Sequence, residues 1–173
     1  TNTVNWKNIS NPATTPFTLV KDSSSITYSL LSYSGDILVD DVSFLIETPG
    51  KAVEHNNLQN GSFENLPITA TNAYYAAVSP TSVEPWKTTA TDQKIELFKT
   101  VSSDGNNTNT QHFQYPKNGP IDRTLPDPVQ AAELNAEQSS SLYQYIKTES
   151  GSQYKWKLSH RGRLGADIMA LVI

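Results

Sequence analysis

Short runs of alternating apolar and polar residues recur along this chain, and turn-forming residues separate them. Successive side chains of a strand point to opposite faces of a sheet, so such alternation predicts half-buried β-strands. The predicted strands are ITYSLLSY (26–33), DILVDDVSF (36–44), LQNGSFENL (58–66), QKIELFKTV (93–101), VQAAELNA (129–136), SLYQYIKT (141–148), SQYKWKLSH (152–160) and DIMALVI (167–173). The pattern therefore predicts an all-β domain.

Local signals refine this prediction. Ser34-Gly35 lies between the first two runs and favours a hairpin turn. Asn60-Gly61 interrupts the third run, so a turn is the alternative to a strand there. The segment AAELNAEQSSSLYQYI also fits a helix, but its serine triplet and strand-rich surroundings favour strands. Two stretches, 69–91 and 102–128, are expected to be long loops. Strict alternation predicts that one face of 36–44 consists of Leu38, Asp40, Val42 and Phe44.

Charge and cysteine content exclude several classes of protein. The 173 residues include 13 Lys and Arg against 17 Asp and Glu, which gives a net charge of −4 and argues against nucleic-acid binding. No apolar run approaches the ~20 residues of a membrane helix, so no membrane insertion is expected. Cysteine is absent, which excludes disulfides and thiolate zinc sites. Low charge, many Thr and Asn residues and no cysteine are typical of extracellular or cell-wall-attached bacterial proteins.

Four motifs follow one another along the chain: NGSFE (60–64), EPWKTTATDQKIELF (84–98), QAAELNAEQSSSLYQYIKTESGSQYKWKLSHRGR (130–163) and GADIMALVI (165–173). This series resembles the jelly-roll, galactose-binding-like domains of bacterial cell-surface proteins. It is more distantly similar to DUF642-like proteins of plant cell walls and to xylan- or cellulose-binding modules. The resemblance implies a two-sheet antiparallel jelly-roll sandwich that binds a ligand rather than catalysing a reaction.

The order of the motifs differs from that of such domains. A strand like ILVDDVSF comes last in them, whereas here it precedes NGSFE. The resemblance divides the chain into 1–46 with C-terminal-type strands, a linker at 47–57, and 58–173 with N-terminal-type strands. We expect a single, circularly permuted jelly-roll domain over 1–173, in which the two parts complete each other. The alternative is strand complementation between chains, which gives head-to-tail self-association.

The resemblance also implies a structural calcium ion. Jelly-roll domains of this kind often hold Ca²⁺ between their first and last strands, where NGSFE and ILVDDVSF lie. Calcium prefers hard oxygen ligands, which here are Glu64 and either Asp40 or Asp41. The alternative is that all three are solvated carboxylates at strand ends.

Candidate ligand contacts come from aromatic and basic residues. Sugar rings pack on exposed aromatic rings, and the candidates in loops or at strand ends are Tyr74, Tyr75 and Tyr115. The segment SHRGR (159–163) adds His160, Arg161 and Arg163, since guanidinium groups suit carboxylates, including those of uronic acids. The alternative for the two arginines is pairing across strands with Asp92, Glu96 or Glu133. Trp86 and Trp156 are expected to pack in the core.

Catalytic motifs are missing from the sequence: it contains no GxSxG, HExxH, P-loop or GxGxxG. Alternation also predicts that Asp40 and Asp41 point to opposite faces and cannot flank one glycosidic bond. We therefore expect a non-catalytic extracellular binding or adhesion module for a carbohydrate or a host-surface ligand. The alternatives are a structural repeat of a surface fibre and an accessory domain that targets a catalytic partner.

Overall fold

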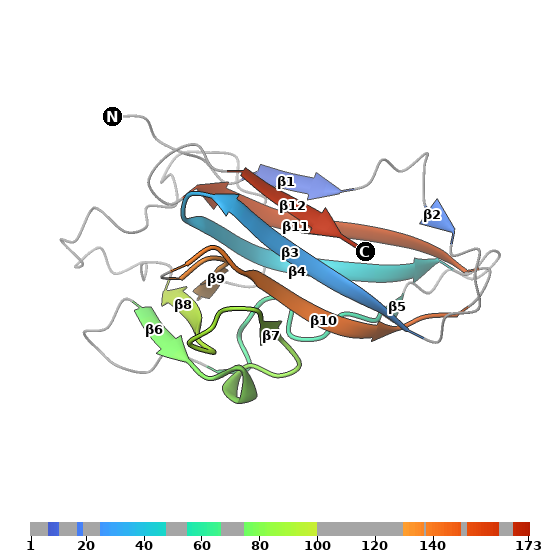
Figure 1. Cartoon of the computed structure of the whole chain (residues 1–173). Coiled ribbons are helices and arrows are strands. Elements are labelled where there is room, and N and C mark those ends of the chain that lie inside the picture. Colours follow the sequence, from blue (N-terminus) through green and yellow to red (C-terminus); the bar gives the residue numbers. More distant parts are fainter. Residues whose placement is uncertain are drawn as a thin grey trace, which may run out of the picture.

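The computed structural model describes residues 7–10, 17–18, 25–47, 55–66, 75–99, 130–136, 138–149, 152–162 and 168–173. These residues form two antiparallel β-sheets that pack against each other (Figure 1). The prediction of an all-β, two-sheet antiparallel sandwich is therefore confirmed. No helix in the described part of the chain is long and apolar enough to cross a membrane.

The larger sheet, called sheet A, has the strand order β1 (Lys7–Ser10), β11 (Gln153–Gly162), β4 (Ile37–Glu47), β9 (Gln130–Glu133), β8 (Ile95–Lys99) and β6 (Tyr75–Val78). Two short strands extend it, since β2 (Phe17–Thr18) pairs with β11 and β5 (His55–Asn56) pairs with β4. The smaller sheet, called sheet B, has the order β12 (Ile168–Val172), β3 (Ser25–Ser34), β10 (Ser141–Lys147) and β7 (Lys87–Thr88). One turn of 3-10 helix, η1 (Pro80–Ser82), lies between β6 and β7.

The strands β3 and β4 lie inside the two sheets rather than at their edges. β4 lies between β11 and β9, and β3 lies between β12 and β10 (Figure 1). The expectation that the run at 36–44 forms a central strand is confirmed. These pairings join the N-terminal strands β3 and β4 to strands of the C-terminal part of the chain.

The predicted hairpin at Ser34-Gly35 is wrong, because β3 and β4 belong to different sheets. Gly35 has φ 81°, a left-handed conformation that glycine adopts without steric cost, and the chain crosses from sheet B to sheet A here. Asn135 holds the crossing: its Oδ1 accepts from Ile37 N at 3.2 Å, and its Nδ2 donates to Asp36 Oδ1 at 3.1 Å. Alternation within two neighbouring runs does not distinguish a hairpin from such a crossing, because each run has one apolar face in either case.

A β-bulge interrupts the alternation of β4, so the predicted faces of 36–44 are also wrong. The pairing of β4 with β11 shifts register between Lys157 and Ser159. Asp41 lies at this bulge with φ 50°, and a left-handed first residue is a known bulge geometry. The extra residue changes which positions face inward. The core-facing residues of β4 are Ile37, Val39, Val42, Phe44 and Ile46.

Three other segments had alternative or uncertain predictions, which the structure resolves. Residues 58–66 form turns instead of a strand, with Asn60 at φ 49°, which confirms the alternative at Asn60-Gly61. The described residues of 130–148 include the strands β9 and β10 and no helix, so the helical alternative is wrong. The expected loop at 69–91 contains β6, η1 and β7. The expected loop at 102–128 and residues 48–54 of the expected linker lie outside the described residues.

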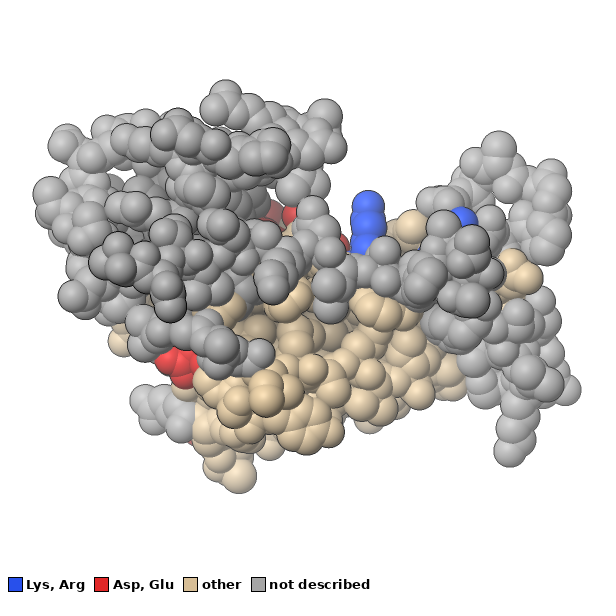
Figure 2. All heavy atoms as spheres, turned by 90° about the horizontal axis from the view of Figure 1, so that it is seen from above, with Lys and Arg blue, Asp and Glu red and all other residues tan. Residues whose placement is uncertain are grey.

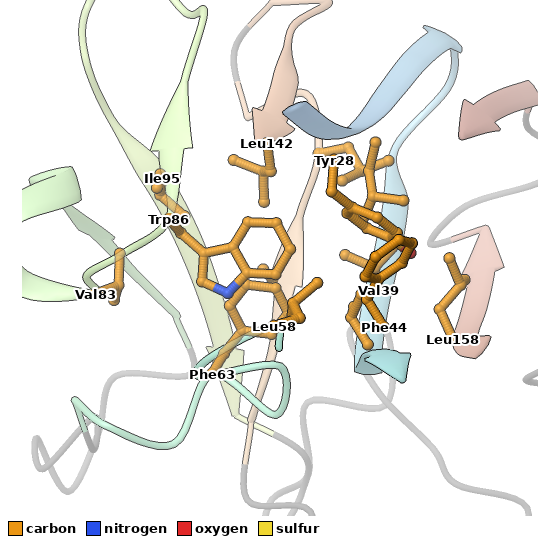
Figure 3. Close-up of a cluster of buried hydrophobic side chains, with 14 of the residues drawn as sticks. Tyr28, Val39, Phe44, Leu58, Phe63, Val83, Trp86, Ile95, Leu142 and Leu158 are labelled. Atoms are coloured by element: carbon orange, nitrogen blue, oxygen red, sulfur yellow. The ribbon is translucent and has the colours of Figure 1, made fainter. Parts of the chain in front are cut away.

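The core lies between the sheets and joins residues from distant parts of the sequence (Figure 3). Trp86 is fully buried and stacks on Phe63, with ring centroids 5.0 Å apart. Phe44 of sheet A contacts Tyr28 of sheet B at 5.6 Å and stacks on Tyr154 at 5.0 Å. The packing roles expected for the tryptophans agree with this core, to which Trp156 adds a partly buried side chain.

Candidate functional site

The NGSFE loop packs directly on the bulge of β4. Gly61 O accepts a hydrogen bond from Val42 N at 3.0 Å, and this bond takes the place of a pairing with a neighbouring strand. A Cβ atom on Gly61 would lie 1.8 Å from Val42 O. Only glycine therefore fits at this position. The loop is fixed against the strand that carries Asp40 and Asp41.

Two buried glutamines hold the same loop from both sheets. Gln130 of β9 donates its backbone N–H to Glu64 Oε1 at 2.9 Å, and its side-chain amide donates to the backbone oxygens of Phe63 and Leu66. Gln144 of β10 exchanges two hydrogen bonds with the backbone of Gln59. The position of Glu64 is thus set by the backbone of β9 and by the packing of its own loop.

Asp40 is a buried carboxyl group in an acidic environment. It is 1 % exposed, and its Oδ1 accepts from Asp41 N at 2.7 Å. Its Oδ2 is buried without a hydrogen-bond partner among the described residues. The pKa of Asp40 is raised to about 8, first by burial and then by the charges of Asp41 and Glu64, against the lowering effect of the bond from Asp41 N. The charge of Glu64 therefore acts on the carboxyl group of Asp40.

Asp41 interacts with residues of β11, the strand that pairs with β4 on the side away from β9. Its side chain is half-buried, and burial raises its pKa, whereas the charge of Lys157 and a hydrogen bond with Ser159 on β11 lower it. The prediction that Asp40 and Asp41 point to opposite faces assumed simple alternation, which the bulge interrupts. The burial of Asp40 nevertheless keeps the pair from forming an open acid pair on either side of a sugar chain.

The carboxylates beside the bulge are possible ligands for calcium. Within the described ranges, no three His, Cys, Asp or Glu side chains are grouped as a metal site. Asp40 Oδ2 is nevertheless an orphaned buried oxygen beside the charge of Glu64, and both are the hard donors that calcium prefers. Asp40 and Glu64 fit an ion whose remaining ligands are backbone carbonyls or water, while Asp41 is directed toward Lys157 and Ser159.

The predicted ligand-binding residues are not gathered in one described patch. Tyr75 is 43 % exposed on β6 and stacks on Phe98 of β8 at 5.7 Å. His160 is half-buried on β11. Arg161 is placed only by its backbone, which pairs with Leu38, and Leu38 in turn pairs with Glu133. Tyr74, Tyr115 and Arg163 lie outside the described residues.

Sequence analysis missed a group of tyrosines on the outer face of sheet B. Tyr33 of β3 and Tyr145 of β10 are each 63 % exposed, and Tyr143 contacts Tyr145 edge-on at 5.7 Å. Partial desolvation raises the pKa of Tyr143, and so do the charge and hydrogen bond of Tyr145. The signal was present in SLYQYIKT, where every second residue from Tyr143 is large and Leu142, Gln144 and Ile146 between them are buried.

We call this surface the tyrosine face and define it by the outward positions of sheet B. Its members are Ser25, Thr27, Ser29, Leu31, Tyr33, Lys87, Ser141, Tyr143, Tyr145, Lys147, Ile168, Ala170 and Val172. They include two lysines and, among these described positions, no acidic residue. In the view from above, which does not single out this face, most of the described atoms belong to residues that are neither acidic nor basic (Figure 2).

Comparison with protein-family models, with curated proteins and with solved structures found no match to this chain. The resemblance to galactose-binding-like domains therefore stays a prediction from the motifs.

Proposed function

We propose that this chain is a non-catalytic module that binds carbohydrate at a cell surface, as part of an extracellular or cell-wall-attached protein. The observation that carries the proposal is the exposure of Tyr33 and Tyr145 on an ordered sheet. Exposed large aromatic side chains on a soluble domain are costly in solubility and are typical of binding surfaces. A tyrosine ring offers an apolar surface to a sugar ring, and its hydroxyl group remains able to form hydrogen bonds.

The tyrosines lie among side chains that suit a hydroxylated ligand. Tyr143 is opposite Ser29 and Tyr145 is opposite Thr27 in the pairing of β10 with β3. Hydroxyl side chains both donate and accept hydrogen bonds, and they match the hydroxyl groups of sugars without introducing charge. Because the positions are fixed by strand pairing, little conformational entropy is lost when a ligand orders them.

The alternative function, a fibre repeat assembled by strand complementation between chains, predicts open positions inside the sandwich. β3 and β4 already occupy interior positions of their own chain's sheets. This favours a monomeric module over a donor-strand fibre. Light scattering distinguishes the two, because complementation gives oligomers that grow with protein concentration, whereas the module stays monomeric.

Calcium is proposed as a structural ion held by Asp40 and Glu64. The support is the unsatisfied, buried Oδ2 of Asp40 next to a second carboxylate. An ion that binds only the folded state adds about 2.7 kcal/mol to the free energy of unfolding at a hundred times its dissociation constant. Glu64→Gln should remove this increment while its amide oxygen still accepts from Gln130 N. An unchanged melting temperature with chelator and with calcium contradicts the site.

The proposed function is tested with a glycan array, using wild-type protein and a Tyr143→Ala/Tyr145→Ala double variant. The expected result is binding of at least one glycan by the wild type and its loss in the variant, with equal melting temperatures. Tyr28→Phe, altered on the inner face of the same sheet, serves as a control that should bind normally. Absence of binding to any glycan, or binding that survives the double variant, contradicts the proposal.

A further inference from the structure

The tyrosine face carries positive charge on a protein that is negative overall. Lys87 and Lys147 are both exposed and both belong to this face, whereas the whole chain has a net charge of −4. Sheet A carries charges of both signs, since Asp41, Glu96, Lys155 and Lys157 on its strands are all at least partly exposed. Among its described outward positions, sheet B carries positive charge alone.

The two lysines flank the tyrosine pair. Lys87 of β7 is the direct pairing partner of Tyr143. Tyr143, Tyr145 and Lys147 are alternate residues of β10, so they point to the same side, and the stretch from 143 to 147 spans about 13 Å. Lys87 therefore lies beside Tyr143 on the neighbouring strand, and Lys147 follows Tyr145 along β10.

We propose that the tyrosine face binds an anionic polysaccharide, a sugar chain that carries carboxylate or sulfate groups. This inference rests on the proposed carbohydrate-binding function and adds the chemical class of the ligand. Rings pack on Tyr143 and Tyr145, and the anionic groups interact with Lys87 and Lys147. The lack of acidic side chains at the described positions of the face removes a repulsion that would otherwise disfavour such a polymer.

A flat, exposed site suits a long polymer better than a small molecule. The face runs from Tyr145, which pairs with Thr27, to Tyr33 six residues further along β3, a distance of about 20 Å. Small ligands are usually enclosed in concave pockets, whereas a chain gains affinity from several weak contacts along its length. Exposed charge pairs contribute modestly and are screened by salt, so the preference for a charged chain should decline at high ionic strength.

Two matched pairs of polymers test the inference by titration calorimetry with the intact chain. The first pair is polygalacturonate and its fully methyl-esterified form, and the second is dextran sulfate and dextran. For at least one pair, we expect the affinity for the charged polymer to be roughly fivefold to tenfold higher than for the uncharged polymer. Which pair shows the difference tells whether the site prefers carboxylate or sulfate groups. The preference should disappear at ~1 M salt, where the screening length is about 3 Å.

Charge variants locate the site. Lys87→Gln/Lys147→Gln should remove the preference for the charged polymer, and Lys94→Gln, an exposed lysine outside the face, should keep it. Equal melting temperatures show that the fold is retained. A preference that survives the double variant, or that Lys94→Gln reduces equally, overturns the assignment to this face.

Equal, tyrosine-dependent binding to both members of each pair overturns the anionic class but leaves the proposed function intact. Absence of binding to these polymers and to the glycan array contradicts both.

Discussion

On sheet B, the outward side chains of β3 and β10 are exposed or half-exposed, and those between them are buried except for the partly buried Ile26. On sheet A, β9 is buried at all four positions, and the outward residues Leu38 and Asp40 of β4 are no more than 1 % exposed. The first pattern belongs to a surface that meets solvent, and the second to a strand covered on both faces. The tyrosines and lysines lie on the open surface, whereas the buried carboxyl groups lie on the covered one.

This contrast separates two kinds of candidate site. Covering an exposed aromatic surface with a ligand removes apolar area from water and so favours binding. A buried carboxylate is costly to desolvate and needs a proton, a cation or several hydrogen bonds. Sheet B therefore suits recognition of an external ligand, and the bulge of sheet A suits an internal structural role. The predictions below test this division.

The largest effect is expected where the loop packs on sheet A. Gly61→Ala places a Cβ 1.8 Å from Val42 O, so the loop must leave the bulge and expose the site of Asp40 and Glu64. The free energy of unfolding should fall by about 3 kcal/mol or more, which lowers the melting temperature by roughly 10 °C. Gly35→Ala, at the crossing between the sheets, should cost only about 1–2 kcal/mol. A thermal melt in which Gly61→Ala matches wild type contradicts this geometry.

The next effect concerns the buried acid of sheet A. In chelator, the folded state keeps a proton on Asp40 up to about pH 8, whereas the unfolded chain releases it near pH 4. The folded state thus binds more protons in this window, and stability should fall by up to about 1.4 kcal/mol per pH unit as the pH rises. Denaturant melts between pH 4 and pH 8 measure this decline.

Asp40→Asn is the matched variant for the pH dependence, because it keeps an oxygen for the bond from Asp41 N and cannot titrate. Its stability should vary less with pH, and it should be more stable than wild type near pH 8 in chelator. Identical pH profiles for the two proteins would show that Asp40 is not buried as a neutral acid.

A smaller effect on the free energy of unfolding is expected at two buried tyrosines, one on the inner face of each sheet. Tyr154 OH of sheet A accepts from Glu149 N at 2.7 Å and donates to Glu149 O at 3.3 Å, whereas Tyr28 OH of sheet B is buried with no hydrogen-bond partner among the described residues. Tyr154→Phe should lower the free energy of unfolding by about 1–2 kcal/mol. Tyr28→Phe should leave it unchanged or raise it, because it removes an unsatisfied hydroxyl group. Chemical denaturation checks both, and equal losses contradict the comparison.

Much of the strand content was predictable from the sequence, because period-two alternation carries it directly. β8, β10, β11 and β12 match their predicted runs to within a few residues, and the burial of Trp86 agrees with its expected packing role. The electrostatic effect of Glu64 on Asp40 agrees with the pairing of their motifs that the family resemblance implies. These features depend on local pattern or on the pairing of long segments.

Features that depend on a single residue or on the opposite sheet were not predictable. The bulge at Asp41 shifts the inward positions of β4 by one, and nothing in the local pattern marks an extra residue. The crossing at Gly35 uses the same turn signal as a hairpin. The tyrosine face was missed because the outward direction of Tyr143 and Tyr145 is fixed by which face of β10 meets the core.

The most direct test of the division between the sheets compares one exposed tyrosine from each outer face. Tyr145→Ala removes an aromatic ring from the tyrosine face, and Tyr75→Ala removes one from sheet A, where it stacks on Phe98. Affinity for the best glycan of the array should fall roughly tenfold in Tyr145→Ala, a change of about 1.4 kcal/mol, and should match wild type in Tyr75→Ala. Unchanged affinity in Tyr145→Ala together with lost affinity in Tyr75→Ala would place recognition on sheet A and contradict the account.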